Sequence, residues 1–191
     1  MQFEDLLSHL NVKFDVPATL VGDRIWRSTL DWGELVVLRS EDDSWVRIMV
    51  PIASALQAQP FLQELLEFNF EATTSARYAI AQQMLWAVFN HPLSTLQDPD
   101  LAIALDCLID LKWQGLSRCF EVHADRQVRL IIAASKQQGL TLEATLQNLE
   151  RFYREGIIGN LSDNGETIQL TLDRWRDRLE RLWAENHINL R

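Results

Sequence analysis

The stretch RIWRSTLDWGELVVLRSEDDSWVRIMV, residues 24–50, decides the fold class of the first part of the chain. It contains three runs of the β-branched, aromatic and aliphatic residues that are typical of β-strands: residues 24–30, 34–39 and 45–50. The segments between these runs are rich in Asp, Gly and Ser, which favour turns. Because connections this short join antiparallel neighbours, the stretch predicts an antiparallel meander.

The third run indicates which residues share a face, since side chains alternate between the two faces of a strand. One set is aliphatic and predicts a core face: Val46, Ile48 and Val50. The other set predicts an amphipathic face: Trp45, Arg47 and Met49.

The segments around this meander predict helices and a hairpin. Residues 3–10 and 60–69 carry apolar residues at intervals of three and four, which predicts two helices. Residues 76–80 and 85–90 predict a hairpin around Gln82-Gln83.

A further helix is predicted to open with Asp98 as its N-cap and Pro99 in its first turn. Its buried stripe is apolar: Leu101, Ala104, Leu105, Leu108 and Leu111. The order of elements is α-β-β-β-α-β-β-α. This order predicts an α+β fold, with helices packed on a five-stranded antiparallel sheet.

From about residue 124 the sequence predicts helices alone. One helix ends at Gly139 and a second is capped by Thr141. A third carries apolar residues at intervals of four, three, four and three: Ile168, Leu172, Trp175, Leu179 and Leu182. This seam is too short for an independent coiled coil, so the helix should dock on another element. We therefore predict two domains, an α+β domain at 1–123 and a helical extension of three helices at 124–191.

The net charge separates the same two parts. The 191 residues include 27 Asp and Glu against 18 Lys and Arg, a net charge of -9. Residues 1–123 hold 17 acidic and eight basic residues, whereas residues 124–191 hold ten of each. Affinity for phosphate backbones and anionic lipids depends on Lys and Arg, so the composition disfavours nucleic acid and membrane surfaces as partners.

Signals for export, membrane insertion and metal binding are missing from the sequence. No apolar run approaches the roughly 18–20 residues of a spanning helix, and the acidic start lacks the basic region of a signal peptide. Cys107 and Cys119 are the only cysteines and lack CxxC spacing. We expect a cytoplasmic protein with no cofactor and no bound metal.

Acidic residues near the third helix are the main candidates for catalysis: Asp98, Asp100, Asp106 and Asp110. Two of them are placed to cap the helix and two lie on its solvent-exposed face, which favours a structural role. The alternative is a small hydrolase or metal-dependent enzyme that uses them as paired carboxylates.

Two weaker sites lie further along the chain. Glu121, His123 and Asp125 alternate in a segment that predicts a helix end or a solvated linker rather than a metal site. The C-terminal helices supply a second alternative, a nucleic-acid-binding regulator. Arg151 and Arg154 fall at the end of a helix instead of its start, which disfavours base recognition.

Tryptophan is abundant, with seven Trp against two Tyr. Trp45 and Trp86 lie on predicted strands. By alternation, each side chain points to the sheet face opposite the main core residues or shares its face only with Val88. Aromatic side chains in such positions pack under a covering helix or form a protein interface.

The order of elements, with LLEFNF at 65–70, ARYAI at 76–80, a further strand and the helix opened by Asp98, resembles the type III secretion chaperone-like fold. Small acidic class I chaperones and YbjN-like regulators share this pattern. The resemblance covers roughly residues 1–120 and brings no catalytic residues. It implies a homodimer built around the segment from Leu85 through the Asp98 helix, holding a partner polypeptide on apolar surfaces. The helical extension departs from the family.

Together these observations predict a non-enzymatic protein-binding module acting as a chaperone-like, scaffold or regulatory homodimer. Its expected partners are a second copy of itself and one other protein. The predicted partner or dimer interface contains seven residues: Trp45, Met49, Leu85, Trp86, Val88, Leu105 and Ile109.

Overall fold

The computed structural model of the chain describes residues 1–15, 19–154 and 165–185. The chain divides into two compact units, unit 1 (Met1–Phe120) and unit 2 (Glu121–Arg191). Unit 1 combines a sheet with helices and unit 2 is helical where it is described, which confirms the predicted α+β fold class with a helical C-terminal part. The predicted organisation as two domains that meet at residue 124 stays a prediction.

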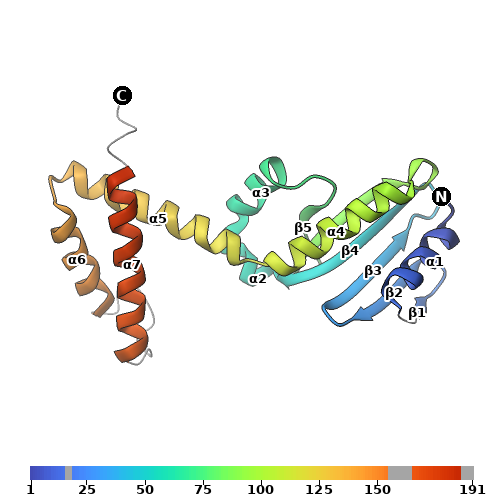
Figure 1. The fold of residues 1–191 in the computed structure, drawn as a ribbon, viewed down its shortest axis with the longest axis horizontal. Helices are drawn as coiled ribbons and strands as arrows, with labels where there is room; N and C mark the ends of the chain where they lie inside the picture. The colour runs from blue at the N-terminus through green and yellow to red at the C-terminus, as the bar shows by residue number, and fades with distance from the viewer. Residues whose placement is uncertain (16–18, 155–164, 186–191) are drawn as a thin grey trace. The chain divides into compact units, whose positions relative to one another are not determined.

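Unit 1 is built on a six-stranded sheet in which all neighbours are antiparallel (Figure 1). The strand order is β1-β2-β3-β4-β6-β5. The strands are β1 Thr19–Val21, β2 Ile25–Leu30, β3 Gly33–Arg39, β4 Trp45–Ser54, β5 Arg77–Ala81 and β6 Met84–Pro92. The prediction of five strands is wrong, because it omits the edge strand β1. All three residues of β1 are exposed, so no alternation of apolar and polar residues marks it in the sequence.

Two helices lie along the same face of the sheet, α1 and α4, as Figure 1 shows. The helical segments of unit 1 are α1 Phe3–Phe14, α2 Ala55–Ala58, the short 3-10 helix η1 Gln59–Phe61, α3 Leu62–Glu71, the 3-10 helix η2 Leu93–Thr95 and α4 Asp98–Gln114. Every helix predicted in this part is present, and α1 and α3 each extend past the predicted end.

The core of unit 1 lies between these helices and the sheet face that they cover. The helices contribute Phe3, Leu6 and Leu10 from α1 and Leu101, Leu105 and Leu108 from α4. The aliphatic set predicted as core in β4 is confirmed, because Val46, Ile48 and Val50 are all 0% exposed. Burying a side chain of this size contributes about 1.5–3 kcal/mol, so alternation along the strands fixes which face carries the helices.

Local sequence signals set the β5–β6 hairpin. Gln82 and Gln83 connect the strands with φ angles of 50° and 61°. A two-residue turn with positive φ at both positions matches the right-handed twist of the strands that it joins. The hairpin predicted around Gln82-Gln83 is confirmed.

The start of α4 corrects one prediction. Gln97 is the N-cap, and Asp98 is already the first helical residue. The Gln97 backbone N–H donates to Oδ2 of Asp100 at 3.2 Å. Because Asp100 closes the helix end from the third helical position, the capping role moves one residue ahead of Asp98.

Unit 2 contains the part of α5 (Ser117–Gln137) from residue 121 onward, α6 (Leu142–Arg154) and α7 (Gly165–Glu185). Gly139 has a φ of 69°, the left-handed conformation that ends a helix, directly after α5. The predicted seam of α7 packs on the other two helices, in a core of Val128, Ile132, Leu146, Leu179 and Leu182. The side chain of Ile168 lies outside the described residues. No described helix combines the length and the apolarity needed to cross a membrane.

The segment from Glu121 to Asp125 corrects a second prediction. It was expected to be a helix end or a solvated linker, yet it lies inside α5. Asp125 accepts from Nε of Arg178 at 2.9 Å and from Nη2 of Arg181 at 2.8 Å, and Glu121 pairs with Arg178. These cations on α7 neutralise acidic residues that lie along a continuous helix.

Candidate functional site

The sheet face opposite α1 and α4, called the open face here, is the candidate site. In β4 every second residue from Val46 to Val50 is buried, whereas the residues between them are half-buried. The open face consists of Ile25, Arg27, Val36, Leu38, Trp45, Arg47, Met49, Trp86 and Val88. All of these except Val36 remain at least partly exposed. The fold therefore presents apolar and basic side chains that it does not fully use for its own core.

An apolar row crosses the open face. The strand register places Val36 opposite Met49, and Met49 opposite Val88. Side chains opposite each other on neighbouring strands lie within contact range, so these three form one continuous surface over β3, β4 and β6. Trp86 follows on β6, and its Nε1 donates to the carbonyl oxygen of Ala81 at 3.0 Å, which fixes the ring.

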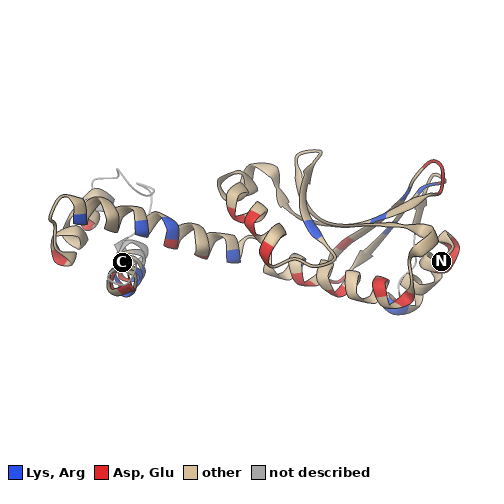
Figure 2. Ribbon diagram, turned by 90° about the horizontal axis from the view of Figure 1, so that it is seen from above, with Lys and Arg blue, Asp and Glu red and all other residues tan. Residues whose placement is uncertain are grey.

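Arginines flank this row. Nε of Arg47 donates to Oδ1 of Asn90 at 2.7 Å, and the guanidinium lies 5.0 Å from the centroid of the Trp45 ring. Arg77 lies beside Val88 on the edge strand β5. Figure 2 shows acidic residues along the helices of unit 1 and several basic residues on its strands. The open face is thus locally basic in an acidic unit.

The loop between β3 and β4 shapes one end of the open face. The Asp42 carboxylate accepts hydrogen bonds from the hydroxyls of Ser44 and Ser40, each at 2.7 Å. These bonds, that of Ser44 first, lower the pKa of Asp42 to about 2. The ordered loop borders a hollow that is also lined by three residues of the open face: Ile25, Leu38 and Trp45.

The seven residues of the predicted interface do not form one surface. Four lie on the open face and are partly exposed: Trp45, Met49, Trp86 and Val88. Leu85 and Leu105 are 1% and 2% exposed and belong to the core under α4, and Ile109 is half-buried on α4. Their role as a partner or dimer interface stays a prediction.

Several residues of the open face were not predicted from the sequence. Arg47 could have been predicted, because alternation along the strand places it on the same face as Trp45 and Met49. Val36 and Leu38 could not have been predicted, since they lie in the unbroken apolar run of β3, in which alternation cannot assign faces.

The carboxylates of α4 do not converge on one site. Asp106 pairs with Nζ of Lys13 at 3.4 Å, Asp98 lies 3.9 Å from Nδ1 of His9, and Asp100 accepts from the Gln97 backbone. In the part of the chain that the structure describes, no three His, Cys, Asp or Glu side chains group as metal ligands. The arrangement gives no support to the paired-carboxylate alternative.

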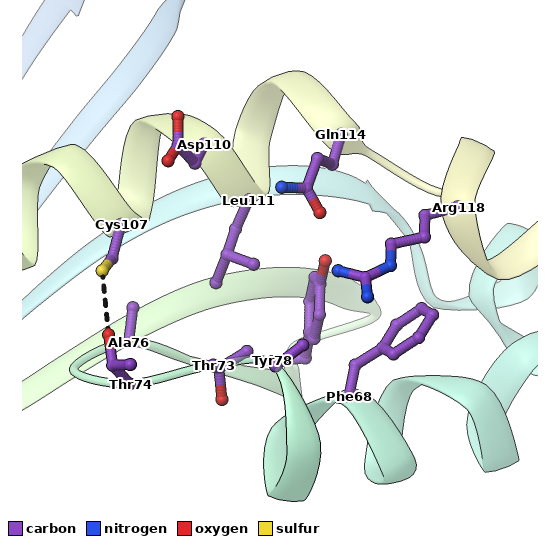
Figure 3. Close-up of a pocket in the computed structure, with 11 residues that line it drawn as sticks. Phe68, Thr73, Thr74, Ala76, Tyr78, Cys107, Asp110, Leu111, Gln114 and Arg118 are labelled. Carbon is purple, nitrogen blue, oxygen red and sulfur yellow. Dashed lines mark hydrogen bonds between the residues drawn. The ribbon is translucent and has the colours of Figure 1, made fainter.

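A pocket opens between α3, β5 and α4, on the helix-covered side of unit 1 (Figure 3). The Arg118 guanidinium lies 4.4 Å from the centroid of the Phe68 ring. Figure 3 shows the Tyr78 hydroxyl directed toward Arg118 and Gln114. Asp110, the remaining candidate carboxylate of α4, also lines this pocket.

The Tyr78 phenol supplies a test of this packing by pH. Burial, followed by the charge of Cys119, raises the pKa of Tyr78 to about 12, whereas an exposed tyrosine ionises near pH 10. The stabilisation linked to Tyr78 is therefore complete below about pH 10 and is lost as the pH rises from about 10 to 12. A Tyr153→Phe variant leaves Tyr78 as the only tyrosine of the chain. We expect its tyrosinate absorbance to rise with a midpoint near pH 12, and a midpoint near 10 would contradict the packing.

Comparison with known proteins finds solved structures that are similar to this chain. No protein-family model matches the sequence, and no curated protein matches it. The chain is similar to a structure described as the HopA1-SchA chaperone-effector complex, with 13% identity and a TM-score of 0.47 over 59% of this chain and 91% of that one. It is also similar to the Yersinia pestis type III secretion chaperone SycH in complex with a fragment of YscM2, with 15% identity and a TM-score of 0.44 over 58% and 97%.

Proposed function

We propose that this chain is a non-enzymatic, chaperone-like, scaffold or regulatory module that holds a partner polypeptide on its open face. The observation that carries the proposal is the apolar row of Val36, Met49 and Val88. Val36 is buried, whereas Met49 and Val88 remain partly exposed on the face that α1 and α4 do not cover. Trp86 follows the row on β6, and Trp45 lies further along β4, beyond Arg47. Partly exposed tryptophans are the side chains that protein interfaces use most effectively.

The shape and chemistry of the open face suit a polypeptide better than a small molecule. Small-molecule sites are concave and bury most of the ligand, whereas this row extends across three neighbouring strands. Met49 adds an unbranched, polarizable side chain that adapts to different partners.

Selection from a random peptide library displayed on phage tests the proposal without a known partner. We expect the wild-type protein to enrich peptides that a Met49→Glu/Val88→Glu variant does not retain, because two carboxylates in the apolar row oppose burial of apolar side chains. Val12→Glu is the matched control, since Val12 is 84% exposed on α1, away from the open face. If the double variant retained the same peptides as the wild type, the proposal would fail.

We propose a homodimer as well, formed through α4. Ile103 and Trp113 expose 53% and 71% of their surface on this helix, and a contact between two copies through α4 would remove these apolar side chains from water. Light scattering at micromolar concentration should give twice the chain mass of 22.1 kDa. Trp113→Arg should shift the population to the single-chain mass. A wild-type mass of one chain would contradict the dimer.

A further inference from the structure

We propose that the open face selects acidic polypeptide segments, in which carboxylates flank an apolar side chain, and that Arg47 and Arg77 bind those carboxylates. This inference rests on the proposed function. The proposed function places the binding site on the open face, and this inference gives the chemistry of the partner that binds there.

The ion pairs of unit 1 distinguish these two arginines from the others in the sheet region. Arg24 pairs with Glu41, Arg27 with Glu34 and Arg39 with Asp43, so three guanidinium groups are neutralised within the fold. Arg47 and Arg77 form no ion pair with any carboxylate among the residues that the structure describes. Two positive charges at the apolar row are therefore left for a ligand.

Arg47 is held in a geometry suited to a carboxylate. Its Nε bond to Asn90 and its position against the Trp45 ring fix the side chain, and both terminal nitrogens remain for a ligand. A guanidinium held this way loses little entropy when it forms two parallel hydrogen bonds to a carboxylate. Its half-buried position reduces screening by solvent.

Arg77 provides the second charge, at the sheet edge. Its Nη1 donates to the carbonyl oxygens of Thr74 and Ala76 at 2.6 and 2.9 Å. These neutral acceptors orient the guanidinium without cancelling its charge. Because Arg77 lies opposite Val88, it stands at the β6 end of the apolar row, and Arg47 lies two residues from Met49 on β4, beside the middle of the row.

The charge of the whole unit makes the inference specific. Residues 1–123 carry a net charge of -9, which repels an acidic ligand at long range. A preference for acidic segments therefore cannot arise from the overall field of this part of the chain. It requires local attraction, and removal of the two arginines should abolish it.

The peptide selection described above tests the inference through the sequences that it yields. We expect the peptides lost on the Met49→Glu/Val88→Glu variant to contain an excess of Asp and Glu over the input library, next to apolar residues. A selected peptide and its analogue with Asn and Gln in place of Asp and Glu are then compared by fluorescence anisotropy. The acidic peptide should bind the wild type at least about tenfold more tightly, and the ratio should fall toward one on Arg47→Gln/Arg77→Gln. Arg24→Gln, at an arginine that is outside the open face and already paired with Glu41, is the control and should keep the ratio.

The outcomes separate this inference from the proposed function. Face-dependent peptides without an acidic excess, or an acidic preference that survives Arg47→Gln/Arg77→Gln, would overturn the inference and leave the proposed function standing. No face-dependent peptide at all would overturn both. If the double variant does not fold, Arg47→Lys and Arg77→Lys keep the charge and lose the paired hydrogen bonds, and each should lower the ratio.

Discussion

Replacing Ile48 with alanine lowers the free energy of unfolding by about 2–5 kcal/mol, the usual cost of such a truncation at a fully buried site. Ile48 is 0% exposed in the middle of β4, on the sheet face covered by α4. The truncation removes apolar contacts and leaves a cavity that the neighbouring strands β3 and β6 can only partly close. Urea unfolding followed by circular dichroism measures the loss as a lower midpoint with an unchanged slope.

Met49→Ala is the matched control, because Met49 is the next residue along the same strand and points to the other face. It is half-buried on the open face, so its truncation should cost about 1 kcal/mol or less. Met49→Ala should instead weaken the peptide binding proposed for the open face, which Ile48→Ala should leave intact at temperatures where the protein stays folded. Equal losses of stability in the two variants would show that both faces of β4 are covered.

Alternation along single strands predicted most of unit 1, because a buried face imposes a period of two on the sequence. It could not identify the face that stays uncovered. Leu85 and Trp86 are neighbours on β6, yet one is core and the other lies on the open face. Both were predicted as interface residues, since the sequence does not show on which side α4 packs.

The features that the sequence did not predict depend on interactions between distant parts of the chain. The acidic segment from Glu121 to Asp125 has the composition of a linker. It stays helical beside Arg178 and Arg181, which lie more than fifty residues further along the chain. The apolar row of the open face likewise needs the register of three strands, and pairing between strands cannot be read from any one of them.

Replacing Leu182 with aspartate should unfold the helices of unit 2 and leave the sheet of unit 1 folded. Leu182 is 0% exposed in the core that α5, α6 and α7 form, next to Leu179. Burying an unpaired carboxylate there costs several kcal/mol, which exceeds what a small three-helix core can compensate. Hydrogen exchange measured by mass spectrometry should show loss of protection in α6 and α7 and retained protection in β4 and β6. Leu130→Asp is the control, because Leu130 is 60% exposed on α5 and its replacement buries no charge.

This result would decide the two-domain prediction, since α5 runs without a break through the boundary between the units. A continuous helix can couple two domains, so chain continuity alone does not establish whether they unfold together. The residues around Leu182 that form its core all lie beyond residue 120, which is why we expect protection in the sheet to persist when that core is lost. If β4 and β6 lost protection together with α7, the chain would unfold as one cooperative unit. The predicted division near residue 124 would then be wrong, even though the net charge changes there from -9 to zero.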